Sequence, residues 1–307
     1  MHLSIVTTLF RSAPYLDEFY RRASTAARQS TEDYEIVFVN DGSPDDSLEM
    51  AVGFAQSDPH VVVVDLSRNF GHHRAMMTGL AHARGKRIFL IDCDLEEDPA
   101  WIARFSEQLD RHQCDVVYGV QEMRKGGLFE RWTGEGFYRI FNMLTGLSLP
   151  KNIIVARLMT RRYVDALLLH HEREIFLAGL WHITGFDQCG INVVKKDKGN
   201  STYSIRHKLS LLVNSITSFS NKPLYTIFYV GVLISLFATI YTIYIVALKI
   251  INDTPLDGWT SVMASIWLIG GFMISFMGVI GIYLAKIFSE SKRRPFTIVR
   301  NIYRNDR

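Results

Sequence analysis

Two long segments without a formal charge constrain the fold of this 307-residue chain more than any other feature. One covers the 26 residues between Lys222 and Lys249, and the other covers the 28 residues between Asp257 and Lys286. As a helix each would be about 40 Å long, whereas the hydrocarbon core of a bilayer is about 30 Å thick. Core helices of globular proteins are seldom so long, so we predict two transmembrane helices.

The charged residues on either side of these segments predict their orientation. The loop between them, residues 251–257, has two acidic side chains and no basic one. Basic side chains stand on the outer flanks, at Arg206, Lys208, Lys222, Lys286, Lys292, Arg293 and Arg294. Because basic residues are retained on the cytoplasmic side, we expect a multi-pass protein of the inner or plasma membrane with both termini in the cytoplasm.

The sequence predicts four parts. Residues 1–203 form a cytoplasmic α/β domain, and residues 204–222 form an interfacial helix with apolar side chains on one side. Residues 223–286 form the two-helix transmembrane domain, and residues 287–307 form a basic cytoplasmic tail.

The first part alternates between short apolar runs and helical patterns. The runs, rich in Val, Ile and Phe, are residues 3–9, 34–39, 61–66, 87–91 and 115–118. The helical patterns are residues 15–28, 45–55, 72–84 and 100–112. This alternation predicts a mostly parallel sheet covered on both faces, in which ligands bind at the carboxyl ends of the strands.

Charge and cysteine content exclude several classes of protein. Of the 34 basic and 31 acidic side chains, 8 basic and 4 acidic ones lie after residue 222, which leaves 26 basic and 27 acidic ones in residues 1–222. This balance gives no positive electrostatic field that would attract nucleic acid. The three cysteines form no CxxC pair, which argues against a disulfide scaffold or a structural zinc site. The first ten residues lack the features of a signal peptide and are typical of a strand, and no GxGxxG follows them.

Acidic residues stand at the ends of two predicted strands. Asp41 ends the second run and precedes Gly42, which favours a ligand role, although an Asx turn capping the next helix is the alternative. The fourth run ends in five acids within seven residues, with Asp92, Asp94 and Glu96 on one side of an extended segment. Such hard oxygen ligands suit Mg²⁺ or Mn²⁺. The alternative, an acidic helix N-terminus in solvent, accounts for residues 97–98 better than for Asp92.

An ordered set of motifs carries a resemblance over nearly the whole chain. The motifs are VNDGS at 39–43, LSRNFG at 66–71, DCDLE at 92–96 and SFSNKPL at 218–224. Together they resemble family 2 glycosyltransferases of the polyprenyl-phosphate type, relatives of dolichol-phosphate mannose synthase and the bactoprenol glucosyltransferases.

The resemblance implies a GT-A fold and an inverting enzyme that moves one sugar from a nucleotide sugar, with a UDP-sugar expected, to undecaprenyl or another polyprenyl phosphate. The product would serve modification of a cell-envelope glycan such as O-antigen. The resemblance also implies that Asp41 holds the nucleotide base, that Asp92, Asp94 and Glu96 hold the metal and diphosphate, and that the chain is a homo-oligomer, a tetramer. The implied nucleotide-sugar ligands are Thr8, Phe10, Val39, Asp41, Asp92, Cys93 and Arg124.

The chain departs from the family pattern at several positions. Glu96 replaces a usual Gln, Gln121 replaces an Arg for which Arg124 can substitute, and residues 8–12 replace the opening Pro-x-Tyr-Asn-Glu pattern. Val155 stands where the family carries an Asp often treated as the catalytic base. A lipid phosphate is already mostly anionic at pH 7, so we expect it to need positioning and charge neutralisation more than proton removal.

Basic residues late in the first part could supply that neutralisation. We predict Asp94, Arg157 and Lys196 as catalytic residues and Lys198, Ser201 and Arg206 as ligands of the acceptor phosphate, with Lys195 a further candidate cation. Alternatively, the lysine cluster only attracts anionic lipid headgroups.

Two other functions stay open on the sequence. A processive polysaccharide synthase usually has Gln-x-x-Arg-Trp and more spans, whereas here Arg124 is followed by Lys125. A non-catalytic membrane scaffold that kept the fold is favoured by Val155 and Gln121 and opposed by the complete acidic cluster.

Overall fold

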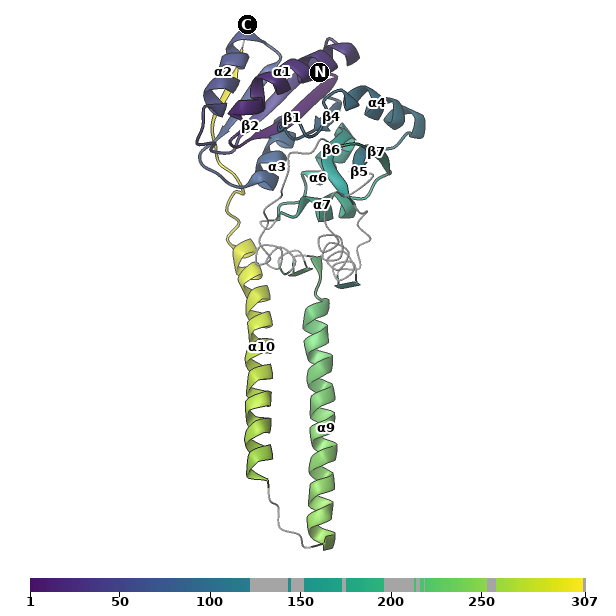
Figure 1. The fold of residues 1–307 in the computed structure, drawn as a ribbon, viewed down its shortest axis with the longest axis vertical. Helices are drawn as coiled ribbons and strands as arrows, with labels where there is room; N and C mark the ends of the chain where they lie inside the picture. Colours follow the sequence, from purple (N-terminus) through teal and green to yellow (C-terminus); the bar gives the residue numbers. More distant parts are fainter. Residues whose placement is uncertain are drawn as a thin grey trace. The chain divides into compact units, whose positions relative to one another are not determined.

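The computed structural model of the chain divides into two units, each described here by itself (Figure 1). The first comprises residues 1–138, 148–203 and 294–307, and the second comprises residues 139–147 and 204–293. The structure describes residues 1–121, 143–144, 152–172, 175–195, 213, 216–217, 219–252 and 258–305.

Four parallel strands form the centre of the sheet in the first unit. They are β1 (Leu3–Leu9), β2 (Tyr34–Asn40), β3 (Val61–Leu66) and β4 (Arg87–Leu90). β1 lies between β2 and β4, and β2 pairs with β3. All side chains of β1, β2 and β3 are buried, as in a parallel sheet covered on both faces, so these strands are near-continuous apolar runs in the sequence. The four predicted strands that correspond to β1 to β4 are confirmed to within a residue at each end.

Helices cover both faces of this sheet. They are α1 (Ala13–Ser30), α2 (Ser47–Ser57), α3 (His72–His82) and α4 (Trp101–His112). α1 contacts α2 and α4, and its Phe19 packs edge-on against Phe38 of β2. α3 packs on the opposite face, where Gly79 lies against Val6 and Val39. A methyl group at Gly79 would come within 2.5 Å of Val6, so this glycine allows the close approach of α3 to the sheet.

A mixed extension continues the sheet beyond β4. Its elements are β5 (Val116–Gln121), β6 (Ile153–Thr160), α6 (Arg161–Leu167), α7 (Leu177–Ile183) and β7 (Gln188–Val193). β6 is antiparallel to both β4 and β5, and β7 is parallel to β5. Leu90 of β4 pairs with Arg157 of β6. This register determines which residues of β6 lie opposite the loop that follows β4.

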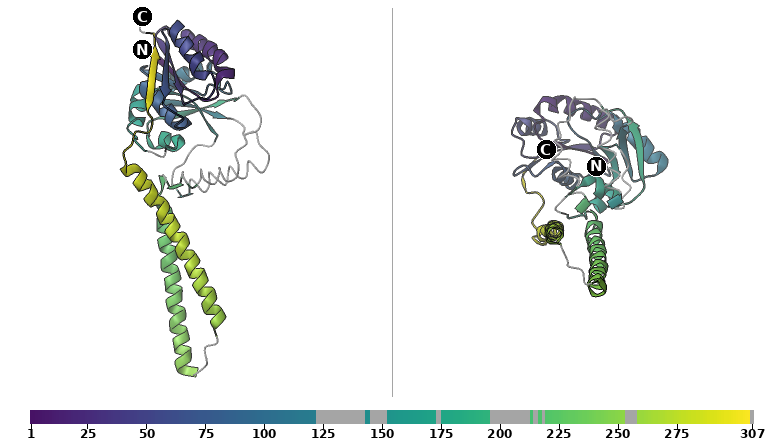
Figure 2. Two further views of the ribbon diagram at one scale, coloured as in Figure 1. Left: turned by 90° about the vertical axis from the view of Figure 1, so that its left-hand side faces the viewer. Right: turned by 60° about the horizontal axis from the view of Figure 1, so that its bottom comes forward.

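The last strand of the sheet comes from the C-terminal end of the chain. β8 (Val299–Arg304) pairs antiparallel with the outer side of β3 and completes the order β7-β5-β6-β4-β1-β2-β3-β8 (Figure 2, yellow strand). The sequence predicted a basic tail over residues 287–307, whereas the structure places residues 294–307 in the first unit. The six residues of β8, VRNIYR, show no clear apolar–polar alternation, so this edge strand does not stand out in the sequence.

Two long helices dominate the second unit. α9 (Lys222–Asn252) and α10 (Trp259–Ser291) contact each other, and each contains a segment long and apolar enough to cross a membrane: Lys222–Tyr241 and Leu268–Ser291. None of the side chains of these segments is buried within the chain. Apolar surface on this scale is not left in contact with water by soluble proteins, so the helices indicate membrane association. Most of the predicted interfacial helix, residues 204–222, lies outside the described residues.

Candidate active site

The carboxyl ends of β1, β2 and β4 bring together three predicted site residues, Thr8, Asp41 and Asp92. The first turn of α3 adds His72, which the sequence analysis did not single out. Because β1 lies between β2 and β4, the three strand ends are adjacent along one edge of the sheet. This edge, with the loops that follow its strands, is called the rim below.

Asp41 holds the loop that follows β3. Its Oδ1 accepts a hydrogen bond from the Phe70 N–H (2.7 Å) and its Oδ2 accepts one from the Gly71 N–H (3.0 Å). Burial raises the pKa of this carboxyl, and the two backbone N–H groups oppose that rise. Gly42, at φ +60°, lies so close to the same loop that a Cβ there would be 2.5 Å from the Asn69 nitrogen. A nucleotide-base role for Asp41 stays a prediction, since both of its oxygens are engaged here.

His72 connects the ends of β1 and β4. Its Nδ1 lies 3.0 Å from Thr8 Oγ1, and its Nε2 lies 3.3 Å from Asp92 Oδ1. Burial lowers the pKa of His72, but the interactions with Asp92, and then the charges of Asp41 and Asp94, outweigh burial and raise it. The imidazole is 48% exposed, so it faces the space above the rim. Its position directly after the LSRNFG motif was the available sequence signal.

The loop after β4 fits a divalent cation in part. Asp92 Oδ1 is buried, with His72 Nε2 at 3.3 Å, so a cation bound there would share this oxygen with the imidazole. Asp94 Oδ1 accepts a hydrogen bond from the Glu96 N–H (3.0 Å), and Leu95 between them has φ +64°. Among the described residues, however, His, Cys, Asp and Glu side chains form no group of three that could hold a metal ion. Asp92 and Asp94 as metal ligands stay a prediction.

The third predicted metal ligand, Glu96, has a basic partner instead. Its Oε2 lies 2.9 Å from Lys195 Nζ, directly after β7, and both side chains are mostly buried. The opposing causes at Lys195 are burial, which lowers its pKa, and the bond to Glu96 with the charge of Glu97, which together raise it. In this structure Glu96 therefore neutralises a lysine, and Lys195 is engaged rather than free to meet an acceptor phosphate.

Glu97 is fully buried, which overturns its interpretation as a solvated acid at a helix N-terminus. Its Oε1 accepts a hydrogen bond from the Val155 N–H (3.1 Å) and lies 3.9 Å from Lys195 Nζ. Burial and the nearby charge of Asp92 raise the pKa of Glu97 to about 8. Asp98, by contrast, pairs with Arg22 of α1.

Val155 lies opposite Asp92 when the pairing register of β4 and β6 is extended beyond the end of β4. Leu90 pairs with Arg157, so the same antiparallel register continued by two residues sets Val155 opposite Asp92. The position that carries an Asp in the family pattern is thus at the rim, and here it presents an isopropyl group and an N–H bonded to Glu97.

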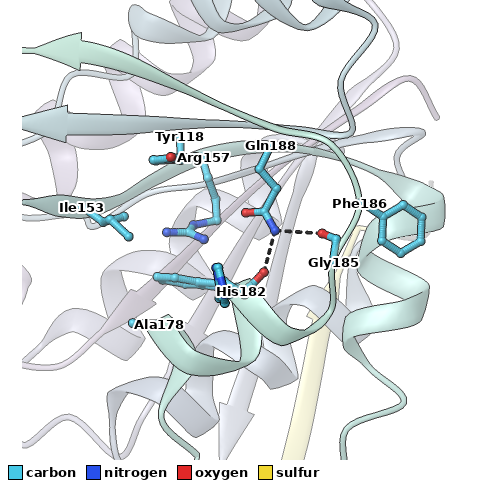
Figure 3. A pocket seen from close by; sticks show the side chains of 9 residues that line it. Tyr118, Ile153, Arg157, Ala178, His182, Gly185, Phe186 and Gln188 are labelled. Carbon is cyan, nitrogen blue, oxygen red and sulfur yellow. Dashed lines mark hydrogen bonds between the residues drawn. The ribbon is translucent and has the colours of Figure 1, made fainter. Parts of the chain in front are cut away.

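Arg157, the predicted catalytic cation, is buried. Its Nε and Nη2 donate to the carbonyl oxygens of Val155 and Ile154 (both 3.2 Å), and its guanidinium stacks on Trp181 of α7. Burial lowers its pKa to about 9. Figure 3 shows it among the side chains that line a cavity of about 370 Å³, with Tyr118 and Gln188. Its catalytic role stays a prediction, because its observed contacts are with backbone carbonyls and an indole ring.

The remaining predicted ligands divide into three groups. Val39 is fully buried and Cys93 nearly so, and a nucleotide-sugar role for each stays a prediction. Phe10 is exposed beside the rim. Outside the described residues lie Arg124, Lys196, Lys198, Ser201 and Arg206.

Comparison with known proteins places these features in a family. Residues 4–168 match the model of glycosyl transferase family 2. A protein of Mycobacterium tuberculosis named among putative glycosyltransferases is 50% identical, over 100% of this chain and 90% of its own length. The glycosyltransferase YkcC of Bacillus subtilis is 35% identical, over 98% and 94%. The bactoprenol glucosyl transferase of Shigella phage SfV is 30% identical, over 98% of this chain and 99% of its own.

Proposed function

The chain belongs to glycosyl transferase family 2, and we propose that it transfers one sugar from a nucleotide sugar, a UDP-sugar in the first instance, to a polyprenyl phosphate. An oxygen of the lipid phosphate attacks the anomeric carbon of the sugar from the side opposite the diphosphate. The bond from that carbon to the diphosphate oxygen breaks, the nucleoside diphosphate leaves, and the product is a sugar on a phosphopolyprenol with inverted configuration.

One observation carries this proposal. Similarity to a bactoprenol glucosyl transferase extends over 98% of the chain and so includes both apolar helices, which lie outside residues 4–168. A soluble family member acting on a soluble acceptor would have no need of these two helices. The rim accordingly lies in a unit that is followed by two helices long enough to cross a membrane.

The rim residues suit the binding of a nucleotide diphosphate. Asp92 and Asp94 would hold Mg²⁺ or Mn²⁺, which supplies charge neutralisation of the leaving diphosphate when bound. Asp41 orders the loop at residues 67–71. His72 lies at the ends of β1 and β4, in contact with Thr8 and Asp92. The negative charge of a diphosphate would therefore face the metal held by Asp92 and Asp94 on one side and His72 on the other.

The acceptor supplies its own nucleophile. A phosphate monoester carries about −1.5 to −2 charges at pH 7, so proton removal contributes little to its attack. Val155 in place of a carboxylate also spares the incoming phosphate a like charge next to Asp92 and Glu97. We propose Lys196, Lys198, Ser201 and Arg206 as the groups that position this phosphate, and a homo-oligomer as the assembled form.

A transfer assay tests the proposal. The full chain, purified in detergent, is mixed with Mg²⁺, undecaprenyl phosphate and a panel of radiolabelled UDP- and GDP-sugars. We expect label in the organic extract only when lipid phosphate, metal and one of the sugars are all present. Label in long, water-soluble chains would indicate a polysaccharide synthase, and no label with any donor would indicate the scaffold.

The topology is tested separately. We propose that the acidic loop at residues 251–257 is extracytoplasmic, because it carries two acids and no base and only Lys249 stands beside it, whereas seven basic residues stand on the outer sides of the two helices. A cysteine at Thr254, in a variant with the three natural cysteines replaced by serine, should react with a membrane-impermeant maleimide in intact cells. Reaction only after lysis would invert the topology.

A further inference from the structure

The strand that follows the second apolar helix reaches the loops of the rim. Ile298, just before β8, accepts a hydrogen bond from the Ser67 N–H (2.9 Å), and Arg300 Nη2 donates to the Ser67 carbonyl oxygen (2.6 Å). Both polar backbone groups of Ser67 are therefore bonded to the C-terminal segment. Ser67 begins the loop whose residues 70 and 71 donate to Asp41.

Arg300 also faces a buried carboxylate. Asp65 of β3 is 1% exposed, and its Oδ2, which has no hydrogen-bond partner, lies 3.6 Å from Arg300 Nη1. Among the described residues, Arg300 provides the ion pair of this group. A buried carboxylate left without a cation destabilises the fold. The partly exposed guanidinium of Arg300 therefore stabilises the buried charge of Asp65.

Asp65 also connects Arg300 to the second loop of the rim, residues 40–43. Its Oδ1 accepts a hydrogen bond from Asn40 Nδ2 (2.8 Å), and Asn40 Oδ1 accepts one from the Ser43 N–H (3.1 Å). Asn40 directly precedes Asp41. The loops at residues 40–43 and 67–71 are thus bonded to each other through Asp41, and each is connected at its base to Arg300.

We infer that β8 completes the donor site and that Arg300 is a positioning residue, which holds the loops at residues 40–43 and 67–71 in the arrangement that accepts a nucleotide diphosphate. This inference rests on the proposed function for the identity of the donor. Arg300 does not touch the substrate in this account; it acts through Asp65 and Ser67. The segment that returns from the membrane would then set the affinity of the enzyme for its water-soluble substrate.

The chain offers a matched control on the same strand. Arg304 pairs with Val62 near the start of β3, whereas Asp65 and Leu66 at the end of β3 lie beside residues 299–301. Arg300→Ala should raise the dissociation constant of UDP with Mg²⁺, and the KM for the donor, about tenfold. Its kcat, and both constants in Arg304→Ala, should stay within about twofold of wild type. Arg300→Lys, which keeps the charge but not the two-sided contact, should lie in between.

Calorimetry on the full chain in detergent, with UDP and GDP as probes, separates the outcomes. Unchanged UDP affinity in Arg300→Ala, with wild type binding normally, would overturn this inference alone. Wild type that binds neither nucleotide would overturn it together with the proposed function. If Arg300→Ala does not fold, Arg300→Lys decides, because wild-type affinity there would also contradict a role for the paired contacts. A second check is Asp65→Asn, in which the added Arg300→Ala change should cost less affinity than it does in wild type.

Discussion

The two sides of the rim hold their charged groups in different ways. On the side of β1, β2 and β3, Asp41 accepts hydrogen bonds from backbone N–H groups of a neighbouring loop. On the side of β4, β6 and β7, Glu96 and Glu97 lie around the side chain of Lys195. The first side carries the VNDGS and LSRNFG motifs and one departure, at residues 8–12, and the second carries the DCDLE motif with the departures Glu96 and Val155.

This difference agrees with what the two substrates of the proposed reaction require. The donor must be held with its leaving diphosphate in line with the attacking oxygen. Loops fixed by backbone hydrogen bonds suit this requirement because they cannot change rotamer as side chains do. The lipid phosphate brings its own negative charge, so we expect the side of β4, β6 and β7 to need a balance of charge and to function with Val155 in place of a carboxylate. Substitutions on the two sides should therefore differ in size and in kind.

The largest effect should come from Asp94→Asn. Loss of one carboxylate from the loop after β4 should abolish Mg²⁺-dependent binding of UDP and lower turnover by about 10³-fold. Relief of repulsion among the acids should leave the variant no less stable than wild type. Calorimetric titration with UDP and Mg²⁺ measures this, with Asp110→Asn, at an exposed carboxylate paired with Arg87, as the control. Wild-type affinity in Asp94→Asn would refute the metal assignment.

A smaller effect is expected for Lys195→Met. Methionine keeps the length of the side chain but removes the cation that pairs with Glu96, so this carboxylate loses its partner in a mostly buried site beside Glu97. We expect a fall of about tenfold in kcat/KM and of about 2–4 °C in the melting temperature. An unchanged melting temperature would show that the lysine does not balance these carboxylates.

Glu96→Gln should change activity by less than about threefold, because the family pattern carries Gln at this position and Lys195 retains Glu97 as a partner. The variant distinguishes the ion pair seen here from a metal ligand. Steady-state kinetics at several Mg²⁺ concentrations measure it. A fall as large as that of Asp94→Asn, with a higher Mg²⁺ requirement, would make Glu96 a metal ligand after all.

The smallest effect concerns stability on the donor side. Burial alone would raise the pKa of Asp45, but hydrogen bonds from Ser43, Ser47 and the Ala13 N–H lower it to about 2. A depressed pKa means that Asp45 stabilises the fold above its unfolded pKa near 3.8 and ceases to do so as the pH falls through about 2. Asp45→Asn should therefore melt about 2–4 °C below wild type at pH 6, and the difference should vanish near pH 2. A difference that persists there would exclude the carboxylate as its cause.

Local pattern was sufficient to predict most of the fold. Strands buried on both faces are continuous apolar runs, so β1 and β3 were predicted with their observed ends. Two uncharged runs predicted α9 and α10, since length and absence of charge are local properties. β8 was missed because pairing with β3, more than 230 residues earlier in the chain, is what makes residues 299–304 a strand.

The site was predicted less completely than the fold, for a related reason. Asp41 and Asp92 follow from the rule that parallel strands end on one edge, and Thr8 was implied by the resemblance. The burial of Glu97 depends on the Val155 N–H, 58 residues away, and Glu96 finds its partner at Lys195. Such contacts between distant segments have no pattern in the sequence, which is why neither the burial of Glu97 nor the ion pair of Glu96 was predicted; a metal role for Glu96 stays a prediction.

The comparison of the two sides depends most on Val155, and Val155→Asp tests it directly. A phosphate nucleophile gains little from a base, and a carboxylate opposite Asp92 adds repulsion. We therefore predict that kcat with a short-chain polyprenyl phosphate changes by less than about tenfold, or about 1.4 kcal/mol of barrier. Val155→Asn, equal in size but uncharged, separates charge from shape. A gain of about 10²-fold or more in Val155→Asp but not in Val155→Asn, as general-base catalysis provides, would contradict the claim that this chain is a competent transferase without that carboxylate.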